Sequence, residues 1–299
     1  MATTTLTPTK HGRTDAVSSV LLVVFWSSGF IGAALGTRYA PAFTILAWRF
    51  MALAAILVVA CLVMRVRPTR GSLGRQSVLG VLCQVAYLGL VFSGVRQGVP
   101  PGVAALIAAM QPMLVATVAG PILGERTDRW QRLGLVLGLG GVTLVVAGDL
   151  GIAGAPWWAY LLPVIGMLCL ATGTVTERRW KPTESLLEAV TIQAVVSALA
   201  FVAIALATGT ATPPASTGFW IAVVWLVGLS SIGGYGAYIF VSRRQGATKV
   251  STMLYLTPPT TMLWAFAMFG DAVPLLGLCG LVVSAVGVSL VLKPRPSRG

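Results

Sequence analysis

The sequence has little charge, few acidic residues and almost no histidine. Only 10% of its 299 residues are charged, whereas a soluble domain carries about a quarter, so a soluble fold is excluded. There are 8 acidic residues against 21 basic ones, and the single histidine, His11, lies in the polar N-terminal tail. Without clustered histidines, cysteines or paired acids, we expect no metal site, no cofactor and no catalytic residues, which argues against an enzyme.

The cysteines do not form a recognisable metal or redox motif. All four lie within apolar stretches and none has C-x-x-C spacing: Cys61, Cys83, Cys169 and Cys279. We expect them to be buried free thiols that behave as small hydrophobic side chains.

Long apolar stretches dominate the remainder of the chain, and 56% of its residues are hydrophobic. Stretches of bilayer-spanning length must be helices, because lipid offers the backbone no hydrogen-bond partners. The sequence therefore predicts an all-α integral membrane protein with ten transmembrane helices. Their expected ranges are 17–36, 40–64, 77–95, 99–123, 131–149, 157–176, 185–208, 218–242, 249–269 and 274–292.

The basic residues are distributed unevenly between the predicted loops. If residues 1–16 are cytoplasmic and the helices alternate, 18 of the 21 basic residues lie on the cytoplasmic side. The far side receives only Arg38 and Arg96, and Arg49 lies inside a helix. This distribution predicts a cell inner-membrane protein with both termini in the cytoplasm. It also favours contact with anionic lipid over binding of nucleic acid.

A sequence pattern is repeated in the two halves. Pro112, Glu125, Gly134 and Gly141 recur 146 residues later as Pro258, Asp271, Gly280 and Gly287. Further matches lie 148 residues apart: Tyr87 with Tyr235, Phe92 with Phe240, and Arg96 with Arg244. Weaker matches, such as Arg49 with Gln193, lie 144 residues apart.

The repeat is predicted to be inverted in the membrane. The loop after Glu125 holds Arg126, Arg129 and Arg132, whereas the loop after Asp271 holds no basic residue. Equivalent loops thus lie on opposite sides, as five helices per half require. We expect a polar tail at 1–16, a first repeat at 17–150, a second repeat at 151–292 and a basic tail at 293–299.

These motifs resemble the EamA-type members of the drug/metabolite transporter superfamily. The resemblance covers residues 17–292 and rests on Trp26–Gly29, Ala47–Phe50, Gln111–Pro112 with Gly124–Glu125, and Gly134–Gly141. It implies eight helices around a central cavity, with the fifth and tenth helices at the periphery, and alternating access between the halves. It does not identify a substrate, because members carry amino acids, sugars, nucleotide-sugars, drugs and other metabolites.

Prolines in the fourth and ninth helices predict two helix breaks near the bilayer centre. Pro112 and the pair Pro258–Pro259 each remove backbone donors and hinder a regular helix. Interrupted helices at equivalent positions of two repeats favour a transport site, although a purely structural kink is the alternative. Gln111 directly precedes the first break and could supply hydrogen bonds there.

Arg49 is the only basic residue deep inside a predicted span. A charge there must face protein or water. One interpretation is that it holds a solute carboxylate. The other, which we favour from the sequence, is structural: Arg49 pairs with carbonyl groups at a helix break or extends outward to the membrane surface. We favour it because the Arg-Phe pair resembles a feature shared by family members that carry different substrates.

Polar and aromatic residues share faces of several predicted helices. Gln84 with Tyr87, and Tyr235 with Tyr238, have the three-residue spacing of one helical face. Trp26 in the first helix and Tyr255 in the ninth are further candidates. Interfacial belts of aromatic residues are the alternative interpretation. A surface lined by aromatic rings with a few amides suits a small, partly apolar solute.

We therefore predict a membrane transporter, exporting small metabolites by alternating access. Amino acids, including aromatic and other apolar ones, are the favoured substrates. Drugs, sugars or nucleotide-linked solutes are the alternative, and a membrane scaffold or enzyme is a more remote one. No acidic residue is predicted in mid-membrane, which favours facilitated transport over ion coupling. Glycines in the fifth and tenth helices allow close helix approach and leave a homodimer through these helices open.

Overall fold

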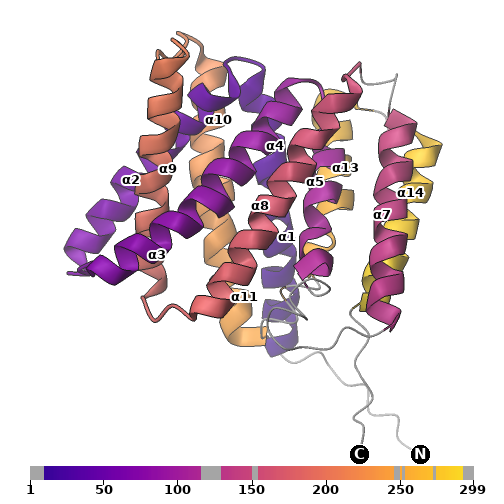
Figure 1. Cartoon of the computed structure of the whole chain (residues 1–299), viewed down its shortest axis with the longest axis horizontal. Coiled ribbons are helices and arrows are strands. Elements are labelled where there is room, and N and C mark those ends of the chain that lie inside the picture. The colour runs from indigo at the N-terminus through magenta and orange to yellow at the C-terminus, as the bar shows by residue number, and fades with distance from the viewer. Residues whose placement is uncertain are drawn as a thin grey trace, which may run out of the picture.

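A computed structural model describes residues 10–115, 129–149, 154–245, 250, 253–271 and 274–291. Within these ranges every regular element is a helix. Figure 1 shows them as a bundle of roughly antiparallel helices, with one pair set apart at an edge. The α-helices of the first half are α1 (Lys10–Thr37), α2 (Ala42–Val63), α3 (Arg70–Gly80), α4 (Tyr87–Arg96), α5 (Pro101–Ala109) and α7 (Arg129–Asp149). Those of the second half are α8 (Leu161–Trp180), α9 (Leu186–Ala207), α10 (Thr217–Trp225), α11 (Gly234–Gln245), α13 (Thr257–Phe269) and α14 (Leu275–Val291).

Seven of the described helical segments are long and apolar enough to cross a membrane. Two of these segments each join several elements, since Arg70–Arg96 and Thr217–Gln245 both run through a central π-helical stretch. Two shorter apolar helices, Pro101–Val115 and Leu275–Gly287, accompany them. The chain is thus a multi-pass membrane protein that is all-helical within its described residues, and the count of ten spans stays a prediction.

In the part of the chain that the structure describes, each half contains one π-helical segment, at equivalent positions. These are η1 (Val81–Ala86), between α3 and α4, and η3 (Leu226–Gly233), between α10 and α11. A π-helical turn widens the helix and often marks a functional position. The sequence-based ranges missed both segments, because hydropathy and length do not distinguish a π-helical stretch from an α-helix.

The helix ends follow from local sequence. At the start of α3, the hydroxyl of Thr69 accepts a hydrogen bond from the backbone N–H of Ser72, and the Ser72 hydroxyl accepts one from the backbone N–H of Thr69. This capping box satisfies two otherwise unpaired donors. Ser185 caps α9 in a similar way. Gly270 ends α13 in a left-handed conformation, with φ at 74°, that a residue with a side chain adopts only at a cost.

The interior is built around stacked aromatic rings. Phe201 of α9 lies 5.5 Å from Phe50 and 6.4 Å from Phe43 of α2, measured between ring centroids. Phe50 and Phe201 are almost fully buried. Their contact joins α2 of the first half to α9 of the second, so the two halves share one core.

The helices α7 and α14 pack side by side at the edge of the bundle (Figure 1). A side-chain carbon on Gly141 would lie 2.5 Å from the Gly280 carbonyl oxygen, and one on Gly287 would lie 2.6 Å from the Gly134 carbonyl oxygen. These glycines therefore allow two helices of the same chain to pack closely against each other. Their opposite sides expose apolar residues such as Val136, Leu275 and Val282.

The two ends of the bundle differ in charge. The end where α1 begins and α11 ends, which we call the basic face, carries most of the described arginine and lysine residues. They include Arg65, Arg67, Arg70, Arg75, Arg178, Arg179, Lys181, Arg243 and Arg244. The opposite face carries Arg38, directly after α1, and Arg96, at the end of α4.

Candidate functional site

The centre of the candidate site is Arg49, a buried cation on α2. Its side chain is 6% exposed, and its Nη2 atom donates to the Ser231 hydroxyl at 3.2 Å. Ser231 lies in η3 and itself donates to the Leu226 carbonyl oxygen. The Arg49 Nε atom has no hydrogen-bond partner. Among the described residues, no carboxylate forms an ion pair with Arg49, so its charge has only neutral neighbours.

Aromatic rings surround this cation. The Arg49 guanidinium carbon lies 5.1 Å from the ring centroid of Phe50 and 5.9 Å from that of Phe92. The phenol groups of Tyr87 and Tyr235 also lie within electrostatic range of Arg49. Aromatic faces stabilise a cation only partly, typically by about 0.5–2 kcal/mol. A buried charge with this environment remains able to bind an anionic group.

Trp26, Tyr235 and Tyr238 form an aromatic group that approaches Arg49 through Tyr235. The Trp26 ring on α1 lies 6.1 Å from the Tyr235 ring and 5.7 Å from the Tyr238 ring on α11. Tyr235 and Tyr238 are still 38% and 37% exposed despite these contacts. Their rings therefore keep free surface on which a solute could pack.

Gln84, another predicted site residue, is engaged elsewhere. Its Nε2 atom donates to Gln193 Oε1 at 2.9 Å, and Gln193 Nε2 donates to Gln76 Oε1 at 2.8 Å. The Ser197 hydroxyl donates to Gln84 Oε1 at 3.4 Å. We call these four residues the amide ladder. It joins α3 and η1 of the first half to α9 of the second, and it leaves Gln84 little capacity to bind a solute.

The predicted prolines lie next to interruptions of their helices. The helix α5 ends at Ala109, two residues before Gln111 and three before Pro112. The Gln111 side chain donates to the Thr174 hydroxyl of α8 at 2.9 Å. Pro112 itself follows the interruption, and residues 116–128, with Glu125, lie outside the described part of the chain.

The second interruption precedes α13. Pro258 and Pro259 lie in the first turn of this helix, directly after a turn at Tyr255 and Leu256. Tyr255 is half-buried and makes no ring contact with the aromatic group described above. The hydroxyls of Thr257 and Thr261 are buried without a hydrogen-bond partner. This break therefore leaves polar groups within the bundle, whereas the structure does not bring Tyr255 to Arg49.

Glu177 is a candidate that the sequence analysis missed. The expected sixth helix ended at residue 176, but α8 continues to Trp180 and carries Glu177 in its last turns. Gly173, one turn earlier, packs against Cys83 of η1. Glu177 lies within electrostatic range of Cys83, Tyr235 and Tyr238, so it lies near the aromatic group on the side of the basic face.

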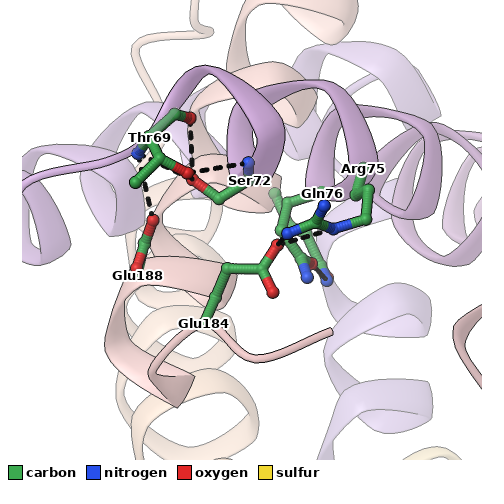
Figure 2. Close-up of polar contacts among 7 residues, drawn as sticks. Thr69, Ser72, Arg75, Gln76, Glu184 and Glu188 are labelled. Atoms are coloured by element: carbon green, nitrogen blue, oxygen red, sulfur yellow. Dashed lines mark hydrogen bonds and ion pairs between the residues drawn. The ribbon is translucent and has the colours of Figure 1, made fainter. Parts of the chain in front are cut away.

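Polar contacts tie the two halves together at the basic face (Figure 2). Arg75 of α3 donates through Nε and Nη2 to Glu184 Oε1, at 3.0 Å and 2.8 Å. The Thr69 backbone donates to Glu188 at 3.4 Å. Burial acts to raise the pKa of Glu184, but hydrogen bonds from its own backbone, Arg75 and the Thr183 backbone outweigh it and hold this pKa below its usual value. Arg75 and Glu184 form a clamp between α3 and the α8–α9 connection.

The opposite face has a different set of contacts. The Arg38 guanidinium carbon lies 4.0 Å from the centroid of the Phe269 ring, which joins the end of α1 to the end of α13. Asp271 follows α13, and burial raises the pKa of its carboxyl group while nearby Arg38 opposes this effect. Within the described ranges, no three histidine, cysteine or acidic side chains are grouped to hold a metal ion.

The fold and this site define a class of protein. A bundle of apolar helices, broken at matched prolines and holding a buried cation among aromatic rings, is the arrangement of a solute transporter. The model of the EamA-like transporter family matches residues 16–147 and again 157–293. The chain belongs to this family and is a membrane transporter, not an enzyme.

Comparison with individual proteins supports the same class. The uncharacterized inner membrane transporter YedA of Escherichia coli is 26% identical over 273 residues, covering 90% of this chain and 88% of the relative. A probable amino-acid metabolite efflux pump of Salmonella typhimurium is 22% identical, covering 92% and 94%. A probable terminal-alkyne amino-acid exporter of Streptantibioticus cattleyicolor is 27% identical, covering 91% of each chain.

A solved crystal structure shows the same fold. It superposes with a TM-score of 0.64 and covers 93% of this chain and 97% of its own. At 22% sequence identity this likeness concerns the fold alone.

Proposed function

We propose that this transporter exports amino acids with apolar or aromatic side chains across the inner membrane. The observation that carries the proposal is the buried Arg49, which has no carboxylate partner among the described residues. An intramembrane cation costs free energy unless an anion offsets it. A solute carboxylate would supply this anion and bind between Arg49 and the hydroxyls of Tyr87 and Tyr235.

The other residues fit the remaining parts of an amino acid. Trp26 and Tyr238 offer ring faces to an apolar or aromatic side chain. Glu177 lies towards the basic face and would attract the ammonium group. The site would then present a cation and an anion separated by aromatic rings, which matches a zwitterion. Two relatives whose names refer to amino-acid metabolites or amino acids add support.

The proposed mechanism is alternating access without ion coupling. The basic face would lie in the cytoplasm, with both termini, and ten helices would form two inverted repeats. The breaks next to Pro112 and Pro258 would let the two halves tilt about the central site. Flux should persist when the proton gradient is collapsed at constant membrane potential. Abolished flux would contradict facilitated transport.

A homodimer through α7 and α14 remains part of the proposal. It would use the exposed apolar sides of this pair, because their glycines already face each other within one chain.

Counterflow in proteoliposomes tests the proposed substrate. The vesicles are preloaded with one unlabelled solute, and uptake of a labelled amino acid is followed. Phenylalanine and leucine should drive accumulation, whereas phenylethylamine, which lacks the carboxylate, should not. Equal activity of the amine, or accumulation driven only by sugars or nucleotide-linked solutes, would contradict the proposal. Empty vesicles and a folded Arg49→Gln variant are the controls.

A further inference from the structure

A groove runs along the outside of the bundle between α1 and α11. It has a volume of about 680 Å³ and is lined mainly by apolar residues. On α1 these include Val17, Leu21 and Phe25, and on α11 they include Gly236 and Phe240. Helical spacing places Gly236 and Phe240 on the side of α11 opposite to Tyr235 and Tyr238. The groove is therefore separate from the proposed amino-acid site.

The surface of the groove is suited to lipid and not to a polar solute. Val17, Leu21 and Phe240 are 52%, 42% and 47% exposed. In a membrane protein such residues on the outside of the bundle face hydrocarbon. A side-chain carbon added to Gly236 would meet no protein atom within 4 Å, so this glycine leaves open space at the groove wall.

Positive charge lies at one end of the groove. Arg243 lies seven residues after Gly236 and three residues after Phe240. This helical spacing places it on the same side of α11 as these two residues, towards the basic face. Its neighbour Arg244 forms an ion pair with Asp15 of α1, and Gln245 Nε2 donates to the Asp15 carbonyl oxygen at 3.0 Å. Arg243 is exposed, and no described carboxylate pairs with it. An apolar groove that ends at an unpaired cation matches an anionic phospholipid.

We propose that one anionic phospholipid binds here, with an acyl chain in the groove and its phosphate at Arg243. This inference does not depend on the identity of the transported solute. A lipid bound here would nevertheless affect transport, because α1 carries Trp26 and α11 carries Tyr235 and Tyr238 on their other faces. The bound lipid would hold the two helices together where the aromatic group is formed.

Native mass spectrometry of the purified full-length protein tests this proposal. The protein is titrated in detergent with phosphatidylglycerol, or with phosphatidylcholine for comparison. Wild type should bind one phosphatidylglycerol more tightly than phosphatidylcholine. Arg243→Gln should weaken the binding of phosphatidylglycerol about fivefold, as the loss of one basic residue near a membrane surface implies. Gly236→Leu should weaken the binding of both lipids, because the larger side chain fills the groove.

Arg179→Gln is the matched control, because Arg179 is also exposed at the basic face but lies at the end of α8. It should leave binding within twofold of wild type. The proposal is overturned if phosphatidylcholine binds as tightly as phosphatidylglycerol, if Arg179→Gln weakens binding as much as Arg243→Gln, or if folded Gly236→Leu binds lipid like wild type. Monodisperse elution and an unchanged helical circular dichroism spectrum establish that each variant is folded. If Gly236→Leu does not fold, the Arg243 and Arg179 variants still test the headgroup site.

Discussion

Two equivalent crossings between the halves differ in chemistry. In one, Arg49 of α2 donates to Ser231 in η3 of the other half. In the other, Gln193 of α9, which lies 144 residues after Arg49, accepts from Gln84 in η1. Each crossing thus joins a helix of one half to the π-helical segment of the other half.

The difference between the crossings indicates where a solute would bind. The amide ladder pairs neutral donors with neutral acceptors, and its members satisfy one another. At the Arg49 crossing, a full charge has a single hydroxyl partner and an unpaired Nε atom. An unsatisfied buried charge costs stability, so its presence favours a role in binding. We interpret the ladder as the structural crossing and Arg49 as the functional one.

The largest expected effect comes from making the two crossings alike. Arg49→Gln should lower the counterflow rate by about 10- to 150-fold, because a hydrogen bond to a charged group contributes about 1.5–3 kcal/mol. The matched variant Gln193→Leu should lower it less than about threefold, since it removes only neutral contacts. Rates are normalised to the amount of folded protein in the vesicles. Wild-type rates in Arg49→Gln would make Arg49 a structural residue.

A smaller effect is expected from the aromatic group. Trp26→Leu should raise the half-saturating phenylalanine concentration about two- to tenfold, because aromatic contacts are worth about 0.5–1.5 kcal/mol. The half-saturating concentration of alanine as the transported solute should hardly change, because its methyl group needs no ring contact. Concentration series for both amino acids provide the comparison. Equal changes for the two would show that Trp26 acts on the fold and not on the solute.

The free energy of unfolding should fall when the amide-ladder crossing is changed, but not when the Arg49 crossing is changed. Gln193→Leu should lower the free energy of unfolding by about 0.6–1.7 kcal/mol, the average and the largest value measured for hydrogen bonds within membranes. Arg49→Gln should leave it unchanged or raise it, because a buried unpaired charge is removed. Unfolding in mixed micelles measures both. A large destabilisation by Arg49→Gln would indicate that Arg49 is needed for folding.

The smallest effect concerns the Arg75–Glu184 clamp and pH. The pKa of Glu184 is held below its ordinary value in the folded protein, so its contribution to stability is present above the unfolded pKa, about 4.3. This contribution should disappear as the pH falls through the folded pKa. Thermal unfolding of wild type and Glu184→Gln between pH 3 and 7 should therefore converge at the acidic end. If the difference in thermal stability between wild type and Glu184→Gln stayed constant over this pH range, the clamp would be excluded as a source of the pH dependence of stability.

The sequence predicted the class of fold because that depends on composition and length. Apolar stretches in lipid can only be helices or closed barrels, and the prolines at 112, 258 and 259 indicated where helices would be interrupted. The sequence could not predict the hydrogen-bond partner of each polar residue. A hydrogen bond such as that from Gln84 to Gln193 depends on packing between segments that are distant in the chain. Arg49 was interpreted as paired with freed carbonyls, whereas the structure gives it a serine hydroxyl.

Helix boundaries explain the remaining omissions. Glu177 seemed to lie beyond the sixth helix, because hydropathy falls where Glu177, Arg178 and Arg179 follow one another. In the structure the helix continues through these charged residues and brings Glu177 near Tyr235. A helical projection of α8 to residue 180 would have found it, because Gly173 and Glu177 are one turn apart.

The most direct test is the preference of the transporter for a carboxylate. Counterflow of phenylalanine and phenylethylamine is measured in wild type and in Arg49→Gln. The account predicts that wild type prefers the amino acid at least about tenfold, and that the variant loses this preference because neither solute finds a cation. A variant that keeps the wild-type preference would contradict a carboxylate-binding role for Arg49.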